Sequence, residues 1–498
     1  MGSVFGTYSI AYSGMVVSQA ALAATSTNLA NVNTTGASQV NVSNAEQNTV
    51  RSDGTSSGDG VGVASITRAR DVLLDSAYRT QNAKSTYWSV KSGNLEYMDE
   101  ILGEYETSST TDDADTTTTT SGVQKTIDDF FSAWQTLSTD STSESTRELV
   151  VSAAVDLVST LSSIDEQLQQ LQKDAVNGVK DGVDSLNDLA SQVADLNDQI
   201  TQAEAGGEEA SYLRDQRDAL LDQMSSLADI KVTETSAGLQ VSLGGINLVN
   251  GDKTHTLAVE GDGSENNPLT VVWEDLNCDA AISSGSIKAY MEDADQTGCE
   301  AIAASDLPYD FTTGAASSIS TLRQALNDLI TTIATKVNSL TASGVDLNGD
   351  AGLALFTTVD SSQPLSIFNI QVNPELVSDS DKVVPSNGSA DGDNSIANQI
   401  CNLAGDTSCY RSGGLSLDIT DFYKTVISWL GTTGETAVNN YDSQAALVEQ
   451  VDTQRQSVSG ISIDEEMANM IQFQNAYAAS ARVMSTIDGL LGDLMDAF

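Results

Sequence analysis

Few residues in this chain could perform covalent or metal chemistry. His255 is the single histidine in 498 residues, and its sequence context alternates in the manner of a strand. Catalysis by a Ser/His/Asp or a Cys/His arrangement would have to use this one side chain. The sequence holds no His-Glu-x-x-His zinc motif and no P-loop. Carboxylate pairs are too common here for any pair to stand out as glycosidase carboxylates. We therefore predict no catalytic residues and no cofactor.

The four cysteines fall into two local pairs, Cys278 with Cys299 and Cys401 with Cys409. This pairing is consistent with two disulfides and an oxidising compartment, and buried free thiols are the alternative. The Cys-x-x-Cys spacing typical of zinc sites is missing. Aspartates within the Ser/Thr/Asp-rich tract at 107–122 could hold a cation, but such a tract is more typical of a solvated loop. We predict no metal site.

The charge balance narrows the possible partners. Acidic residues outnumber basic ones 70 to 22, which gives a formal charge of −48. Binding to nucleic acid or anionic lipid needs clustered Lys and Arg, so neither is expected. Acid scattered along the whole chain suggests salty surroundings, where screening relieves self-repulsion, and an acidic surface for cations is the weaker alternative. We also expect no membrane span and no ordinary signal peptide, so an exported chain would need another route.

The last 39 residues predict a helix that packs along another helix. Ser462 and Glu465 form a capping box at its start. Beyond it, apolar residues recur in the a and d positions of a heptad, which is the pattern of a coiled-coil seam: Met470, Phe473, Tyr477, Met484, Ile487, Leu491, Leu494 and Phe498.

The first 45 residues contain no charged side chain, which is unusual in so acidic a chain. They show a thinner heptad stripe that includes Met15, Leu22 and Leu29. Because a stripe of small residues buries little area, such a helix would be marginal alone in water. We predict that the two terminal helices pair with each other and with neighbouring subunits, and that both become ordered on assembly. Their heptad residues are the predicted subunit interface. A disordered leader is the alternative for the N-terminus.

Between these ends the sequence predicts an α+β, multidomain chain. Apolar residues at three- and four-residue intervals predict helices over about 72–106, 127–137, 148–200, 212–224 and 319–340, with a weak point near Asn177-Gly178 and a turn or hinge at the Gly-rich residues 58–63. Alternation over 231–274 predicts strands. The expected domains are a coiled-coil-like inner domain of the paired terminal helices (1–60 and 437–498), a long-helix bundle (61–230, 316–345 and 395–436) and a β-rich outer domain (231–315 and 346–394).

Two long motifs at opposite ends of the chain carry a family resemblance. The first comprises Ser13-Gly14-Met15, Gln19-Ala20-Ala21-Leu22 and Thr25-Ser26-Thr27-Asn28-Leu29-Ala30-Asn31-Val32-Asn33-Thr34-Thr35-Gly36. The second comprises Asp464-Glu465-Glu466-Met467-Ala468-Asn469-Met470-Ile471 and Gln474-Asn475-Ala476-Tyr477-Ala478-Ala479-Ser480-Ala481-Arg482. Both resemble the terminal signatures of the bacterial flagellar axial proteins, which form the rod, the hook and the hook-associated zones. The helical middle region favours the hook-associated members.

The resemblance implies a structural subunit, not an enzyme, that forms the hook–filament junction as a helical tube. It implies a position outside the cell, reached through the flagellar type III export system. The implied partners are further copies of the chain in a ring or tube, the hook protein, a second junction protein (hook-associated protein 3), the flagellin side of the filament, and an export chaperone on the C-terminal helix.

Two other interpretations stay open at this point. Within the family, the chain could be another axial protein, such as the hook or distal-rod protein. Outside it, a surface adhesin with an acidic β domain would bind a glycan or a cation without polymerising. A binding activity of the excised region 230–384 would favour the adhesin.

Overall fold

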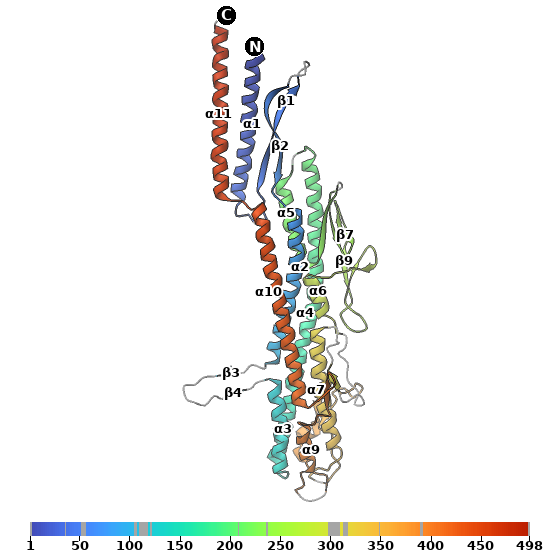
Figure 1. Cartoon of the computed structure of the whole chain (residues 1–498). Coiled ribbons are helices and arrows are strands. Elements are labelled where there is room, and N and C mark those ends of the chain that lie inside the picture. Colours follow the sequence, from blue (N-terminus) through green and yellow to red (C-terminus); the bar gives the residue numbers. More distant parts are fainter. Residues whose placement is uncertain are drawn as a thin grey trace.

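The computed structural model describes residues 2–34, 36–50, 56–103, 107–108, 118–119, 122–207, 209–235, 238–296, 309–311, 317–347, 349–388 and 392–496. The molecule is long and narrow, and both termini lie at the same end (Figure 1). Helix α1 (Gly2–Asn31) lies beside α11 (Ile463–Asp496) at that end, and α2 (Val72–Leu102) lies beside α10 (Ile419–Ser459) below them. The predicted pairing of the terminal helices is confirmed. No helix in the described ranges is both long and apolar enough to cross a membrane.

A long antiparallel hairpin packs against α1. Strands β1 (Val40–Val50) and β2 (Ser56–Arg68) pair from Val40 opposite Arg68 outward. The Gly-rich stretch 58–63, predicted as a turn or hinge, lies inside β2, so that prediction is wrong. Gly60 has a φ of +108°, and a Cβ there would come within 2.1 Å of the Ser13 hydroxyl oxygen. Glycine is therefore needed because the strand backbone runs against α1.

One helix, α4 (Glu144–Glu204), organises the rest of the chain. Its 61 residues span about 90 Å at 1.5 Å per residue. The predicted weak point at Asn177-Gly178 is wrong, because the helix is continuous there. Its glycines instead allow close packing against α6 (Ser286–Asp293): a Cβ on Gly178 would lie 2.9 Å from the Tyr290 ring, and one on Gly182 would lie 2.8 Å from the Ile287 side chain.

Two apolar cores share α4. The first joins its N-terminal half to the end of α2 and to α3 (Val123–Thr139), α7 (Ser318–Thr341), α9 (Ser395–Leu403) and the start of α10. Short elements close it: β12 (Tyr309–Phe311), β13 (Phe356–Thr357), β14 (Gln371–Val372), α8 (Pro374–Ser378), η2 (Ser380–Lys382), β15 (Tyr410–Ser412) and β16 (Leu415–Leu417). Strands β3 (Thr107–Ser108) and β4 (Thr118–Thr119) pair with each other outside this core.

The second core joins the C-terminal half of α4 to α5 (Ser211–Leu227), α6 and two sheets. One sheet has the order β5-β6-β7-β8 and the other β11-β10-β9. Their strands are β5 (Ile230–Thr235), β6 (Gly238–Leu243), β7 (Ile246–Asn250), β8 (Lys253–Thr254), β9 (Leu257–Glu260), β10 (Thr270–Trp273) and β11 (Cys278–Asp279). The alternation over 231–274 thus predicted the strands correctly, and the α+β class is confirmed. The domain boundaries stay a proposal. Because the apolar side chains of residues 346–394 pack in the first core, the proposal groups these residues with the helical bundle.

Candidate functional site

The terminal pair, meaning α1 and α11, meets along a seam of small side chains. On α1 the most buried residues are Ala11, Val17, Ser18, Ala21, Thr25 and Asn28. The Cβ that an alanine would place at Gly14, on the same helix, lies 3.1 Å from the hydroxyl oxygen of Ser480 on α11. Small residues allow the two helices to approach closely, but they bury little apolar area. The pairing is therefore weak for its length.

The predicted interface residues of α11 lie on the side that faces α1. Ile487 is buried, Met470, Phe473, Met484 and Leu491 are half-buried, and Tyr477 is more exposed. On α1 the predicted residues Met15, Leu22 and Leu29 are half-buried and flank the small-residue seam. The Leu494 side chain and Phe498 lie outside the described residues. The role of this set in binding other subunits stays a prediction.

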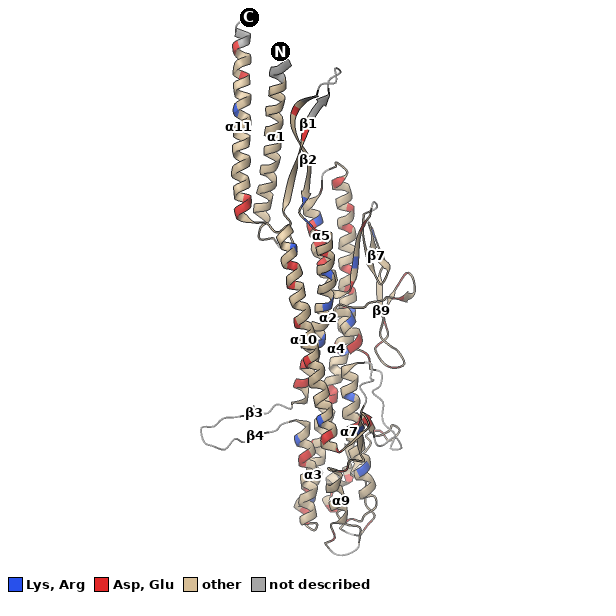
Figure 2. Ribbon diagram, viewed as in Figure 1, with Lys and Arg blue, Asp and Glu red and all other residues tan. Residues whose placement is uncertain are grey.

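The terminal pair also carries exposed apolar side chains, and its charged residues are confined to α11, in the first turn and beyond residue 481. Figure 2 shows α1 without charged residues and α11 with few beyond its first turn. Exposed aliphatic and aromatic residues on the pair include Ile10, Tyr12 and Val16 on α1 and Ile463, Met467, Ile471, Val483 and Leu490 on α11. An uncharged surface with many apolar side chains is typical of a surface that another protein covers.

Asn28 and Glu466 fix where the two terminal helices meet the rest of the chain. Asn28 Nδ2 donates to the Val40 carbonyl (3.0 Å) and to Glu466 Oε1 (3.1 Å), while the Val40 N–H donates to Asn28 Oδ1 (2.9 Å). Gln39 Nε2 also donates to Glu466 Oε1 (2.9 Å), and the Gln39 N–H donates to the Ser459 carbonyl (2.9 Å). These hydrogen bonds therefore connect four elements at one place: α1, β1, α10 and α11.

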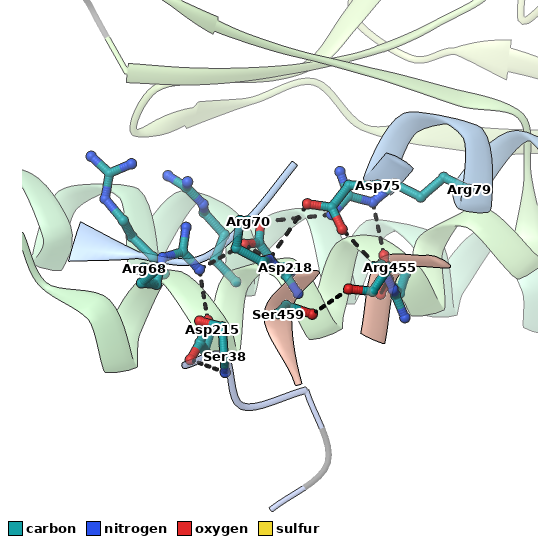
Figure 3. Close-up of polar contacts among 12 residues, drawn as sticks. Ser38, Arg68, Arg70, Asp75, Arg79, Asp215, Asp218, Arg455 and Ser459 are labelled. Carbon is teal, nitrogen blue, oxygen red and sulfur yellow. Dashed lines mark hydrogen bonds and ion pairs between the residues drawn. The ribbon is translucent and has the colours of Figure 1, made fainter. Parts of the chain in front are cut away.

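Just below this point, arginines and aspartates from four segments form a cluster that we call the joint (Figure 3). It consists of Arg68, Arg70, Asp75, Arg79, Asp215, Asp218, Asp222 and Arg455. Arg68 Nη1 lies 2.7 Å from Asp215 Oδ1 and 2.8 Å from Asp218 Oδ2. Four of the 22 Lys and Arg residues of the chain thus lie together where the terminal pair meets the rest of the molecule.

The joint also reaches the connection after α1 and the end of α10. Ser38 donates to Asp215 through both its backbone N–H (2.9 Å) and its hydroxyl (2.7 Å). Arg455 on α10 lies 2.5 Å from Asp222 and stacks over the Tyr78 ring at 3.9 Å. Helices α2, α5 and α10 and the connection between α1 and β1 are therefore held together by charge-assisted bonds.

Burial and neighbouring charges act differently on the carboxyl groups of the joint. Burial alone would raise the pKa of Asp218, but the charges of Arg70, Arg68 and Arg79 outweigh it and hold this pKa below its ordinary value. For Asp75, burial is the larger effect, and its pKa is raised although Arg70 and Arg79 lie nearby. Asp218 is therefore the firmly ionised centre of the joint.

From spacing alone, Asp215, Arg217 and Asp218 would form surface ion pairs that contribute little. The structure contradicts this. Instead both carboxylates are largely buried against Arg68 and its neighbours, and Arg217 turns away to donate to Asn197 Oδ1 at 3.0 Å. The available signal was the density of arginines over 68–79, three within twelve residues of a basic-poor chain.

The residues considered for chemistry lie elsewhere. His255 lies between β8 and β9, with its Nδ1 3.3 Å from Asp275 Oδ2 and its ring edge-on to that of Trp273. Cys278, Cys401 and Cys409 are free thiols in the structure, and Cys299 lies outside the described residues. Burial raises the pKa of Cys409 to about 11, so this thiol is kept neutral. Cys401 and Cys409 therefore do not form the predicted disulfide in the structure, and the predicted pair of Cys278 with Cys299 involves a residue outside the described ones.

Comparisons with known proteins agree with this architecture. Residues 109–356 match the family described as the flagellar hook-associated protein FlgK helical domain. Residues 453–497 match the flagellar basal body rod FlgEFG protein C-terminal family. These two matches cover much of the helical body and all of α11.

Whole-length relatives and a solved structure extend the match. The chain is 29% identical to flagellar hook-associated protein 1 of Bacillus subtilis, over 100% of this chain and 99% of that protein. It is 25% identical to the protein of the same name in Escherichia coli, with 98% of each chain covered. The fold resembles the flagellar hook junction protein FlgK from Burkholderia pseudomallei, with a TM-score of 0.61 at 14% identity, covering 77% of this chain and 100% of that one.

Proposed function

The chain belongs to the flagellar hook-associated protein 1 family, and we propose that it forms the junction between hook and filament as a structural subunit of the bacterial flagellum. Proteins of this family are structural components of the extracellular axial structure and not enzymes. In the proposal, copies assemble into a ring or tube through the terminal pair, while the helical body and the sheets lie outside it. The work of the protein is mechanical, because it joins two tubes of different stiffness.

One observation carries the proposal beyond the family match. In a chain of charge −48, α1 carries no charged residue, residues 467–481 of α11 carry none either, and both helices expose apolar side chains. Copies of so acidic a chain repel each other wherever their charged surfaces meet, so an uncharged surface is the one on which they can pack. The heptad residues of α1 and α11, half-buried by a single partner helix, would become fully buried in such an array.

The joint gives the array a mechanical connection to the rest of the molecule. Buried ion pairs with several partners hold a fixed geometry better than isolated surface pairs do. In the proposal, the joint keeps the terminal pair at a set orientation, so that bending of the inner tube moves the outer body with it. Hook protein on one side, hook-associated protein 3 and the flagellin side on the other, and an export chaperone on α11 before assembly are the proposed partners.

Electron microscopy of flagella from host cells lacking this chain tests the proposal. Hooks without attached filaments are expected, and normal filaments would refute it. In cells that carry Leu491→Asp, the same loss is expected because a charge enters the terminal seam. Val359→Asp, at a residue that is 65% exposed on the body, is the matched control and should leave filaments attached.

A further inference from the structure

The two apolar cores are separated in sequence as well as in space. Within the described residues, every buried side chain of the second core lies between Ala175 and Ala294. Those of the first core lie outside this range, up to Leu168 and again from Phe311 onward. Residues 172–296 are therefore one continuous piece of chain with an apolar core of its own. We call this piece the module; it holds the C-terminal half of α4, α5, α6 and both sheets.

The two ends of the module meet. The chain enters it at Gln172 on α4 and leaves it at Asp295, just after α6, and Gln172 Nε2 donates to the Asp295 carbonyl at 3.3 Å. A unit whose ends lie side by side can be inserted into another fold without distorting it. The helices α4 and α7 of the first core thus continue on either side of a closed insertion.

A buried polar layer lies where α4 passes from the first core into the module. Asp165 and Gln172 are each 1% exposed, and both bind Arg323 of α7. Arg323 Nε lies 2.7 Å from Asp165 Oδ1, and Arg323 Nη1 donates to Gln172 Oε1 at 2.7 Å. Gln172 Nε2 also donates to Ser320 Oγ at 3.1 Å. Such a layer fixes one geometry through its hydrogen bonds, and it interrupts the apolar packing between the two cores.

The contact between the module and α2 is polar too. Lys91 Nζ on α2 lies 2.7 Å from Asp293 Oδ1 and 3.0 Å from Glu292 Oε2. Tyr87 donates its hydroxyl to Glu292 Oε2 at 2.7 Å, and Asn94 Nδ2 donates to Asp293 Oδ2 at 2.6 Å. No side chain of α2 belongs to the core of the module among the residues that the structure describes.

The joint completes this polar boundary, which we call the seam. Three of the four carboxylates of the joint lie inside the module, on α5: Asp215, Asp218 and Asp222. All four arginines lie outside it, on β2, α2, α10 and the connection from β2 to α2 (Figure 3). On both α5 and α6, carboxylates of the module therefore face cations of the rest of the chain.

We propose that the module unfolds and refolds as a unit of its own, and that the seam rather than a shared apolar core holds it against the rest of the subunit. Hydrogen bonds and ion pairs change little in net free energy when both partners reach water, whereas opening a core exposes its apolar side chains. The seam is therefore the place where the subunit yields first. The inferred boundary at residue 172 differs from the boundary near residue 230 that periodicity predicts, and it concerns the single chain whatever its role in the flagellum.

Hydrogen exchange on the full-length monomer, measured by mass spectrometry, tests the module. Leu248→Ala and Leu157→Ala each truncate a leucine that is 0% exposed, the first in the module and the second in the first core. Leu248→Ala should speed exchange in β6 and β10 about tenfold or more and leave α3 and α7 unchanged. Leu157→Ala, the matched variant, should speed exchange in α3 and α7 and leave β6 and β10 unchanged.

The reactivity of the Lys91 ammonium toward an acetylating reagent reports on the seam. Lys91 is 12% exposed, and Lys125 on α3, at 50%, is the matched control. In the wild type Lys91 should react much more slowly than Lys125. In Leu248→Ala, at urea concentrations that still leave α3 protected from exchange, Lys91 should react as fast as Lys125. Slow reaction of Lys91 while β6 exchanges freely would refute the seam.

The outcomes separate this inference from the proposed function. Equal acceleration of β6, β10, α3 and α7 in either variant would show one cooperative unit and refute the module. That result would leave the junction role untouched, because all these measurements use the monomer. Filaments on cells that lack the chain would refute the junction role and leave the module standing.

Discussion

Asn28 and Glu466 are 438 residues apart in sequence, yet Asn28 Nδ2 donates a 3.1 Å hydrogen bond to Glu466 Oε1 in a buried setting. Both side chains are almost inaccessible, at 2% and 1% exposure. The same carboxylate oxygen accepts from Gln39 Nε2 at 2.9 Å. This short network closes the chain on itself and fixes α11 against the end of α1.

Removing the Glu466 carboxylate should therefore loosen α11. Glu466→Ala removes the acceptor of Gln39 Nε2 and one of the two acceptors of Asn28 Nδ2, which still donates to the Val40 carbonyl, and each buried N–H left unsatisfied costs about 1–3 kcal/mol. We expect faster hydrogen exchange in α11 and unchanged exchange in α4. Glu466→Gln keeps an acceptor oxygen and should exchange almost as slowly as the wild type. Equal protection of α11 in wild type and Glu466→Ala would contradict this role.

The joint should contribute far more to stability than an exposed ion pair does. Asp218→Ala removes the buried carboxylate that Arg68, Arg70 and Arg79 share, so each keeps only its second partner, Asp215, Asp75 or Asp222. Breaking a buried pair in this way costs about 3–5 kcal/mol. We expect a clearly lower free energy of unfolding in urea titrations.

Asp129→Ala is the matched control for the joint. It removes the partner of Lys125 in a pair whose side chains are 50% and 57% exposed, and such pairs contribute about 0–1 kcal/mol. Similar losses in the two variants would show that the joint is no stronger than a surface pair.

Close packing at the crossing of α4 and α6 should make Gly178 intolerant of a methyl group. Gly178→Ala puts a Cβ 2.9 Å from the rigid Tyr290 ring. Overpacking costs about 1–3 kcal/mol, and on average this exceeds the roughly 1 kcal/mol that alanine gains over glycine in a helix. Gly93→Ala on α2 meets no atom within 4 Å and should stabilise the chain. Thermal unfolding of the two variants checks these opposite signs, and a stabilised Gly178→Ala would contradict the crossing.

The buried carboxyl of Asp328 should make the folded protein less stable as pH rises. This carboxyl is fully buried in α7, and burial raises its pKa to about 8, although hydrogen bonds from Tyr309 and Gln324 act in the opposite direction. The unfolded chain has the ordinary value near about 4, so between these values the folded state holds a proton that the unfolded state lacks. The contribution to stability is full below about pH 4 and is lost as pH rises to about 8.

Asp328→Asn should therefore flatten this pH dependence, because the amide stays neutral. Gln324 Nε2, 2.7 Å from Asp328 Oδ1, can still donate to the amide oxygen. Urea unfolding of both proteins between about pH 5 and pH 8 is the measurement, with the variant gaining most at the upper end. Parallel curves for the two proteins would mean that Asp328 does not titrate in this range.

Local periodicity predicted much of this fold. The a and d spacing in residues 460–498 predicted a helix that packs along another helix, which the pairing of α11 with α1 confirms, and alternation over 231–274 gave the outer strands. On α1 the spacing was less informative, because the tightest contacts are made by Ala11, Ala21 and Gly14 rather than by the larger Met15 and Leu22. On α1, the buried residues are those that lie closest to neighbouring elements, and not those with the largest side chains.

The joint and the hairpin could not be predicted from local patterns. Arg68 and Asp215 meet across 147 positions of sequence, and no spacing rule connects them. Gly178 was predicted as a weak point in a helix, and the stretch that contains Gly60 as a turn or hinge, because glycine is flexible in isolation. In the folded chain each one instead marks a place where two elements approach too closely for a side chain. Such contacts depend on the tertiary arrangement and not on local preference.

Assembly should strengthen as salt is added, because copies of charge −48 repel one another. The Debye length falls from about 10 Å at 0.1 M to about 3 Å at 1 M, so repulsion between neighbouring bodies is largely screened in concentrated salt. α1 and residues 467–481 of α11 carry no charge, so their apolar contacts remain when charges are screened. We expect the retention of filaments on isolated hooks to rise with sodium chloride, measured by electron microscopy. The urea midpoint of the monomer is the control, since the buried pairs of the joint are screened much less. Retention that is flat or falls from low salt upward would show that attraction between charges, and not apolar packing, holds the copies together.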